Sequence, residues 1–222
     1  MLAASFTYAA VASAARPFVT DDARIVDPGG YQIETFVKRQ NRFGEHEFWF
    51  LPAMNAGGAV ELTLGGTGTD SALNGSSRTA LLQAKTLLKP LETNGSGVAL
   101  TLGVARLQPP RAPRADTPYL NAIASRSFRD DRVVLHANLG AQRDRQAGLT
   151  RGTWGLGGEL VLAPRVIAIA ESYGQRGEKP TLHGGVRFWV VPNRLQLDAT
   201  LGNQNSGPPK RSFHSAGLRI LF

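Results

Sequence analysis

The feature that most constrains the fold of this sequence is a recurring alternation of apolar and polar residues. Segments of about ten residues alternate with period two, and each ends at Gly, Pro, Asn, Asp or Arg. No helical period persists over a long window, and no uninterrupted run of about eighteen apolar residues occurs, which excludes a bundle of transmembrane helices. Because successive side chains of a strand point to opposite faces, the pattern predicts an all-β chain.

Twelve segments show this pattern. They are residues 31–40, 45–53, 59–66, 78–89, 97–107, 118–128, 132–143, 152–162, 166–174, 181–191, 194–202 and 211–222. Alternation is clean in most of them; the segment 194–202, for example, has Leu195, Leu197 and Leu201 on one face and Gln196 and Asp198 on the other. Alternation is ambiguous in 45–53, 118–128 and 166–174, so ten strands is the alternative.

Alternation alone does not separate a transmembrane barrel from a soluble β-protein, because both have one apolar and one polar face. The last segment favours the barrel. An aromatic residue at the end of the closing strand can lie in the membrane interface with its carboxylate in water. This strand resembles the C-terminal targeting signal that the barrel-assembly machinery reads. The residues that make up this expected signal are His214, Ala216, Leu218, Ile220 and Phe222.

Loop lengths support the same architecture. With Phe222 on the periplasmic side, the connections alternate between the two sides. The periplasmic connections are then Met54–Gly58, Pro90–Ser96, Arg129–Asp131, Ala163–Arg165 and Pro192–Asn193. The outer ones are Asn41–Gly44, Thr67–Ser77, Gln108–Thr117, Asp144–Arg151, Gln175–Pro180 and Asn203–Lys210. We therefore predict a single antiparallel transmembrane β-barrel with short periplasmic turns and longer outer loops.

The first residues predict export from the cytoplasm. Leu2 to Val11 is a short apolar run, and Ala12-Ser13-Ala14 is a small-x-small cleavage site, so residues 1–14 are expected to be a signal peptide. No Lys or Arg precedes the run, so this signal peptide is truncated or degenerate. A short N-terminal helix packed on a domain is the alternative. The barrel is then expected to span residues 15–222, in the outer membrane of a Gram-negative bacterium.

Composition limits the kinds of partner and site that can be expected. The formal net charge is +8, but the 25 Lys and Arg residues are scattered rather than gathered in a stripe, so no nucleic-acid partner is expected. Cysteine is absent, which excludes a disulfide scaffold and a thiolate zinc site. The expected partners are outer-membrane lipid, the barrel-assembly machinery and a small-molecule solute.

The start of the predicted mature chain resembles a known family. Arg16-Pro17, Thr20-Asp21-Asp22, the stretch from Gly30 to Glu34, and Ala170-Glu171-Ser172-Tyr173-Gly174 are similar to motifs of outer-membrane proteins assigned to the MetA pathway of phenol degradation. The resemblance implies an outer-membrane barrel and, loosely, passage of small hydrophobic or aromatic compounds. It does not imply a function specific to phenol.

Ionisable residues on the polar faces are the candidate functional groups, because they would line the lumen. They are Glu34, Lys38, Glu61, Lys85, Glu159, Glu171, Arg187, Asp198 and Arg219. Their signs are mixed, so they could line a narrow channel or pair across the barrel and close it. A barrel of twelve strands lies between filled and water-conducting sizes. A third reading is a soluble periplasmic barrel that binds an apolar ligand inside, which requires the opposite orientation of the faces.

No enzymatic, metal or cofactor site is expected. His136 and Asn138 share a face, but we find no serine at a matched position on a neighbouring strand, so esterase or phospholipase chemistry is not predicted. His46, His136, His183 and His214 lack metal-type spacing. Gly155-Leu156-Gly157-Gly158 lies inside a strand pattern, where glycine eases curvature, rather than in a nucleotide-binding loop.

Overall fold

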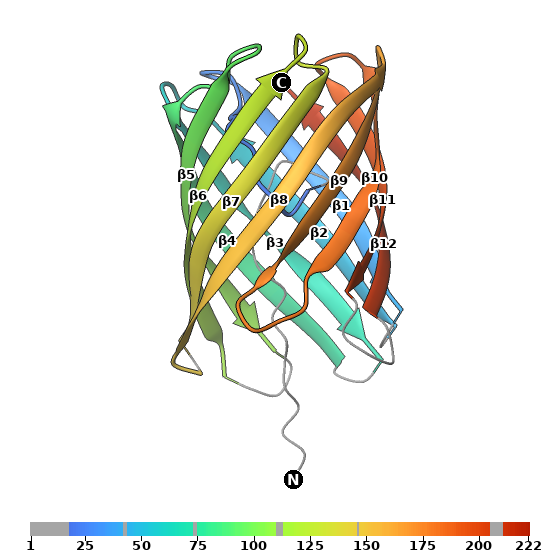
Figure 1. Ribbon diagram of the computed structural model, residues 1–222. Coiled ribbons are helices and arrows are strands. Elements are labelled where there is room, and N and C mark those ends of the chain that lie inside the picture. The colour runs from blue at the N-terminus through green and yellow to red at the C-terminus, as the bar shows by residue number, and fades with distance from the viewer. Residues whose placement is uncertain (1–17, 42–43, 73–74, 110–112, 146, 205–210) are drawn as a thin grey trace.

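The computed structural model describes residues 18–41, 44–72, 75–109, 113–145, 147–204 and 211–222. These residues form twelve antiparallel strands in one closed barrel, in which each strand pairs with its sequence neighbours and β1 pairs with β12 (Figure 1). The predicted all-β fold and the count of twelve are confirmed, and the alternative of ten strands is wrong. Within the described residues, no helix is long and apolar enough to cross a membrane.

The strands are long and tilted relative to the barrel axis (Figure 1). Their bounds are β1 Tyr31–Gln40, β2 Glu45–Met54, β3 Val60–Ser71, β4 Gly75–Lys89, β5 Ser96–Gln108, β6 Ala115–Phe128, β7 Val133–Asp144, β8 Leu149–Ala163, β9 Val166–Gln175, β10 Thr181–Val191, β11 Leu195–Gln204 and β12 Arg211–Leu221. All three ambiguous segments are strands.

Pairing of the first and last strands closes the barrel. The register places Ile33 opposite Ile220 and Val37 opposite Ala216. At the end of this seam, Tyr31 and Phe222 exchange both backbone hydrogen bonds, at 3.2 and 2.9 Å. The closure leaves no strand edge without a partner, which removes the usual route to edge-to-edge aggregation.

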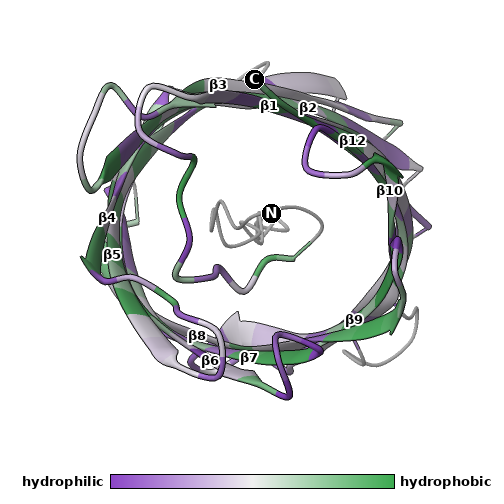
Figure 2. Cartoon of the chain, turned by 90° about the horizontal axis from the view of Figure 1, so that it is seen from above, coloured by the Kyte–Doolittle hydropathy of each residue, from purple (hydrophilic) through white to green (hydrophobic). Residues whose placement is uncertain are grey.

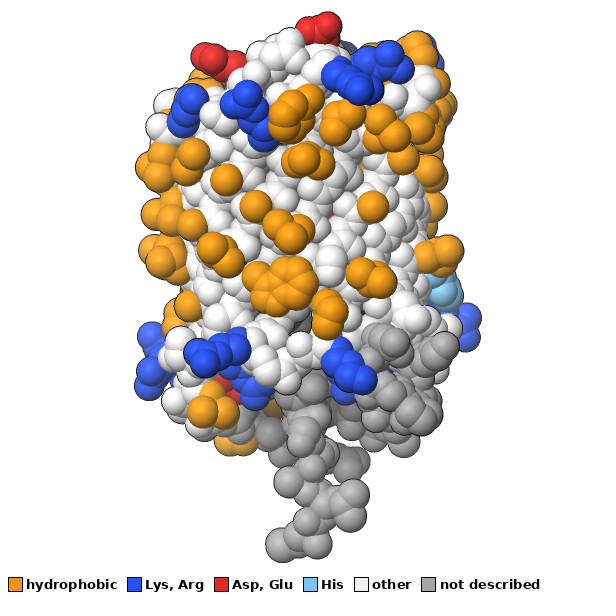
Figure 3. Space-filling model, viewed as in Figure 1, with side chains coloured by type: hydrophobic (Ala, Val, Ile, Leu, Met, Phe, Trp, Pro, Cys, Tyr) orange, Lys and Arg blue, Asp and Glu red, His pale blue; other side chains and the backbone are white. Residues whose placement is uncertain are grey.

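The outer surface of the barrel is apolar and the inner surface is polar. Large apolar side chains point outward, among them Leu64, Leu102, Leu139, Leu182 and Leu201, each at least 61% exposed. Figure 3 shows such side chains over the middle of the wall, with Lys and Arg gathered towards the two ends. This orientation is the reverse of what a soluble barrel with an apolar interior requires.

The predicted difference in loop length is largely absent. β3 continues to Ser71 and β4 begins at Gly75, so most of the predicted outer loop Thr67–Ser77 is strand. The ladder continues through polar pairs such as Thr67 with Thr79 and Thr69 with Ser77. A strand that leaves the apolar zone can keep its backbone hydrogen bonds without apolar side chains. The end of the alternation therefore did not mark the end of the strand.

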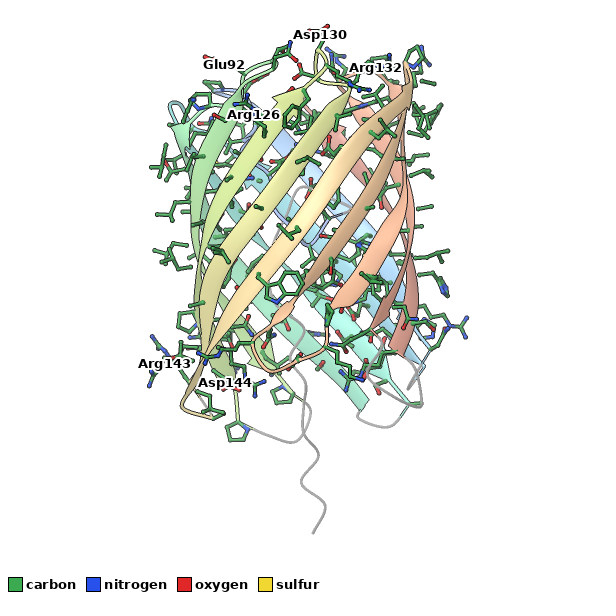
Figure 4. All side chains as sticks on the ribbon, viewed as in Figure 1. Glu92, Arg126, Asp130, Arg132, Arg143 and Asp144 are labelled. Atoms are coloured by element: carbon green, nitrogen blue, oxygen red, sulfur yellow. The ribbon has the colours of Figure 1, made fainter. Side chains whose placement is uncertain are left out.

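Two turns at the Phe222 end are bound to each other. Asn94 Nδ2 donates to Asp130 Oδ1 at 2.6 Å, and Thr93 Oγ1 donates to Asp131 Oδ2 at 2.5 Å. Hydrogen bonds from Ser127 and Thr93 hold the pKa of Asp131 below its ordinary value. Figure 4 shows Asp130 at this end and Arg143 and Asp144 at the opposite end. These contacts fix the β4–β5 turn against the β6–β7 turn.

An apolar cluster fills part of the interior. Leu51, Leu81, Ala105 and Tyr119 are buried together, and the stacked rings of Phe36 and Trp49 pack against them with centroids 5.5 Å apart. Tyr119 lies over Gly103 of the neighbouring strand. A Cβ at that glycine would stand 2.4 Å from the ring, so the cluster depends on glycine there.

We therefore expect Gly103→Val to lower the free energy of unfolding by about 1–3 kcal/mol, because the added side chain must push Tyr119 out of the cluster. The measurement is urea unfolding of the protein refolded in lipid. Gly68→Val is the matched control, since Gly68 is exposed on β3 and has no atom within 4 Å of an added Cβ. Equal midpoints for the two variants would contradict the assigned packing.

Candidate functional site: the lumen and its N-terminal segment

The chain that precedes β1 lies inside the barrel. Residues 18–30, called the lumen segment below, run along the inner wall (Figure 2). Phe18, Thr20, Asp21, Asp22 and Ala23 are each 4% exposed or less. The sequence pattern predicts no position for this stretch beyond its place in the barrel domain. The predicted signal peptide, residues 1–14, lies outside the described residues.

Side chains of the wall bind the backbone of the lumen segment. The Glu171 carboxylate accepts the N–H groups of Val19 at 2.8 Å and Thr20 at 2.6 Å. Asn138 accepts the N–H of Asp21 at 2.6 Å and donates to its carbonyl at 2.9 Å. These groups belong to a segment without strand pairing, so the wall supplies the partners that buried backbone needs.

Two further wall residues bind the later part of the segment. Ser125 Oγ accepts the N–H of Ala23 at 2.9 Å, and Glu61 accepts the N–H of Val26 at 2.8 Å. Asn55, at the end of the barrel, donates to the carbonyl of Val26 at 2.9 Å. The segment is therefore held along its length and not only at its link to β1.

Charged side chains add a second set of contacts. Lys85 Nζ lies 2.7 Å from Asp21 Oδ1 and 3.3 Å from Asp22 Oδ1, and all three side chains are at most 5% exposed. Arg24 of the segment lies 3.4 Å from Asp22 and 3.5 Å from Glu159. Every charge in this group faces an opposite charge, which is what makes burial of so many ions tolerable.

Two glycines of β8 make room for the lumen segment. A Cβ at Gly155 would stand 2.5 Å from Thr20 Oγ1, and one at Gly157 would stand 3.4 Å from both Phe18 and Thr20. The sequence analysis attributed the Gly155–Gly158 run to strand curvature. The structure gives a different reason for two of its glycines, which is the close approach of the segment to the wall.

A small cavity lies beside the segment. Its volume is about 20 Å³, and Arg24, Glu61 and Lys85 are among its lining residues. Such a volume holds about one water molecule. Apolar contacts of the segment are few: Phe18 packs on Ile169 and Ile167, and Ala23 on Ala99 and Ile123. The segment thus occludes this part of the lumen mainly through polar contacts.

The nine predicted lumen residues all lie on the inner wall. Glu34, Glu61, Lys85, Glu159, Glu171, Arg187 and Asp198 are buried, and Lys38 and Arg219 are partly buried. The structure brings Glu61, Lys85, Glu159 and Glu171 to the lumen segment. Lys38 instead pairs with Glu47 at 3.2 Å, and Arg219 lies 3.3 Å from Glu34.

The C-terminal residues face the other way. His214 and Ala216 are exposed on the outer surface, and Phe222 is 70% exposed. Their role as a targeting signal remains a prediction.

The statement that no serine matches His136 is wrong. Ser125 of β6 is its direct cross-strand partner, and Ser125 Oγ lies 2.8 Å from His136 Nδ1. His136 Nε2 is 3.5 Å from Glu159 Oε1, so Ser, His and Glu adjoin one another. Ala23 covers the serine, however, and its N–H occupies the hydroxyl oxygen. The pairing was missed because β6 was ambiguous in sequence and its register could not be fixed.

The remaining histidines do not gather. His183 Nδ1 lies 2.5 Å from Glu171 Oε1, and His46 and His214 are exposed. Among the described residues, no group of three or more His, Cys, Asp or Glu side chains is placed to hold a metal ion.

Comparison with known proteins gives a family and a fold. A family model described as "Uncharacterised conserved protein UCP029691" matches residues 2–222. The chain belongs to this family. A search of curated proteins finds no match. The MetA-pathway resemblance remains a prediction.

Solved structures that resemble the chain are outer-membrane barrels. The NanC porin has a TM-score of 0.63 and 5% identity, and the KdgM porin has 0.60 and 11%; each match covers 85% of this chain and 98% of the other. Outer membrane phospholipase A from Escherichia coli has a TM-score of 0.53 and 9% identity, and 92% of each chain is covered. At these identities the likeness establishes the fold alone.

We expect Lys85→Met to lower the free energy of unfolding by about 3–5 kcal/mol, because it leaves the Asp21 carboxylate buried without its cation. The measurement is again urea unfolding in lipid. Lys89→Met is the matched control, since Lys89 lies on the same strand but is exposed and donates to Ser96. If both variants unfold at the same urea concentration, Lys85 does not anchor the segment.

Proposed function

We propose that the protein is an outer-membrane channel for small solutes, and that the lumen segment holds it closed in the conformation described here. The observation that carries this proposal is the polar character of the segment's attachment. Hydrogen bonds and ion pairs to the wall can be exchanged for water or for a solute, whereas a tightly packed apolar plug could not leave without a large loss of buried apolar surface.

The outer surface supports the location. A barrel whose wall exposes Leu and Phe side chains between two charged ends fits a bilayer, where closed strands satisfy every backbone group internally. Two of the similar structures are porins by name. We therefore place the protein in the outer membrane of a Gram-negative bacterium, with Phe222 on the periplasmic side.

A non-conducting structural barrel is the second candidate. The observation in its favour is the number of hydrogen bonds and ion pairs that hold the segment against the wall. The two proposals differ in one respect that can be measured: only the channel must release its segment.

The protein is not proposed to be an enzyme. A serine nucleophile must be reached by the substrate carbon, and Ser125 is 3% exposed beneath Ala23. Ser125, His136 and Glu159 are sufficiently explained as partners of the lumen segment, since Ser125 binds Ala23 and Glu159 binds Arg24.

The class of solute that the family resemblance implies, small hydrophobic or aromatic compounds, remains a prediction. The feature of the lumen that favours it is the cluster of Phe36, Trp49 and Tyr119, whose rings could contact an apolar group. Charged side chains elsewhere in the lumen favour a solute that also carries polar groups.

Gly155→Val tests the closure without changing any charge. Its side chain would take the place of Thr20, so we expect the segment to be displaced and the single-channel conductance in planar bilayers to exceed that of the unchanged protein severalfold. Gly152→Val is the control, because Gly152 lies on the same strand with only Gly140 O, at 4.0 Å, near an added Cβ.

Heat-dependent mobility on a detergent gel must first show that each variant has closed its barrel. Folded Gly155→Val protein that passes neither ions nor solute would refute the channel and support the structural barrel.

A further inference from the structure

The inner wall binds the lumen segment in the way that a receptor binds a peptide. Its side chains take up the N–H groups of Val19, Thr20, Asp21, Ala23 and Val26 and the carbonyl of Asp21. Such contacts are made to the main chain. They do not require the particular side chains of residues 19, 20, 23 and 26.

The wall also binds charged side chains of the segment, and Asp21 has the shortest of these contacts. The Asp21 carboxylate lies 2.7 Å from Lys85 Nζ and accepts a hydrogen bond from Thr101 Oγ1 at 3.3 Å. Lys85 also contacts Asp22 at 3.3 Å. The wall therefore combines contacts to the main chain with a buried pocket for a carboxylate, at Lys85 and Thr101.

These wall residues come from different strands in spatial order. Glu171 lies on β9, Asn138 on β7, Ser125 on β6, Thr101 on β5 and Glu61 on β3. A ligand that touches all of them must run across these strands inside the barrel, as the segment does in Figure 2. A compact solute such as a free amino acid could reach only one part of this row.

Neighbouring side chains of the wall hold these binding residues in place. Asn121 donates to Asn138 Oδ1 at 3.1 Å, which fixes the direction of the Asn138 amide. His136 lies 2.8 Å from Ser125 Oγ, and His183 lies 2.5 Å from Glu171. These partners belong to the strands and not to the segment.

From this arrangement we infer that the lumen is a binding site for an acidic peptide that follows the path of the lumen segment, and that the lumen segment occupies this site as an internal competitor. The inference rests on the proposed function, since the site is reached only when the segment withdraws. The ligand is a short stretch of peptide whose Asp or Glu side chain enters the pocket at Lys85 and Thr101, while its main chain meets Glu171, Asn138 and Ser125.

The test uses the full chain with Asp21→Asn and Asp22→Asn, which weakens the internal competitor and leaves the wall unchanged. The probe is a fluorescent peptide of the sequence VTDDARIV, residues 19–26, added to the refolded variant in detergent micelles. We expect its anisotropy to rise on binding. A peptide with Asn at both acidic positions should bind at least about tenfold more weakly, because it loses charge-assisted hydrogen bonds.

Three controls separate the parts of the site. Adding Asn138→Leu to the variant removes contacts to the peptide main chain. It should therefore weaken the binding of the acidic peptide and of the Asn-containing peptide by similar factors. A scrambled peptide of the same composition should bind more weakly than VTDDARIV. Trigalacturonic acid carries carboxylates without a peptide main chain; if it competes as well as VTDDARIV does, the site is an anion site and the inference is overturned.

Conductance distinguishes this inference from the proposed function. If the acidic peptide binds the variant selectively while no variant conducts, the peptide site stands and the channel fails. If Gly155→Val conducts but the acidic peptide binds the Asp21→Asn, Asp22→Asn variant no better than the scrambled peptide, the channel stands and the inference is overturned. Selective binding together with block of the current by VTDDARIV supports both.

Discussion

Burial of Asp21 and Asp22 against Lys85 is the interaction on which the interior of this barrel depends. The three side chains are at most 5% exposed, so in this conformation water does not reach a charge that has lost its partner. Each therefore needs the others, and the lumen segment must remain in the barrel for Lys85 to stay paired with them. Arg24 extends the same dependence to Glu159 on β8, which Arg187 of β10 also contacts at 3.2 Å.

The choice of residues in the barrel wall depends on the lumen segment as well as on the membrane. Outward positions need only be apolar, and many are Leu. Inward positions instead vary from Gly155, which must have no side chain, to Glu171, which must reach two N–H groups. A lumen that had only to be polar would not need a particular residue at each of these inward positions. The inner face is thus complementary to one particular segment of the chain, whereas the outer face needs only to be apolar where it meets lipid.

Much of the fold could be predicted from sequence, because the rule that sets it is local. Alternation along residues such as Leu195 to Leu201 directly reports which face meets lipid. The ends of the strands are harder to predict, because Thr67 and Thr69 continue the hydrogen-bonded ladder without apolar side chains. The lumen segment has no period at all. Thr20-Asp21-Asp22 stood out only as part of a family resemblance, and its buried position depends on five strands that are distant in sequence. The Ser125–His136 contact was missed for a related reason, because it depends on register.

The way in which the segment is tied limits how the lumen can open. Its link to β1 lies at the Phe222 end of the barrel, where Gly29 donates to the Asn55 carbonyl at 2.7 Å and the Asn55 N–H donates to Gly30 at 3.1 Å. Gly29 has a φ of +80°, a conformation that favours glycine, so this turn is built to reverse the chain from the lumen into the wall. The covalent link to β1 fixes the Val26 end of the segment. Hydrogen bonds to Glu171, deeper in the lumen, hold the Phe18 end. If the segment leaves the lumen as proposed, its covalent link to β1 keeps the Val26 end near the Phe222 end of the barrel, and the β1–β12 seam need not break.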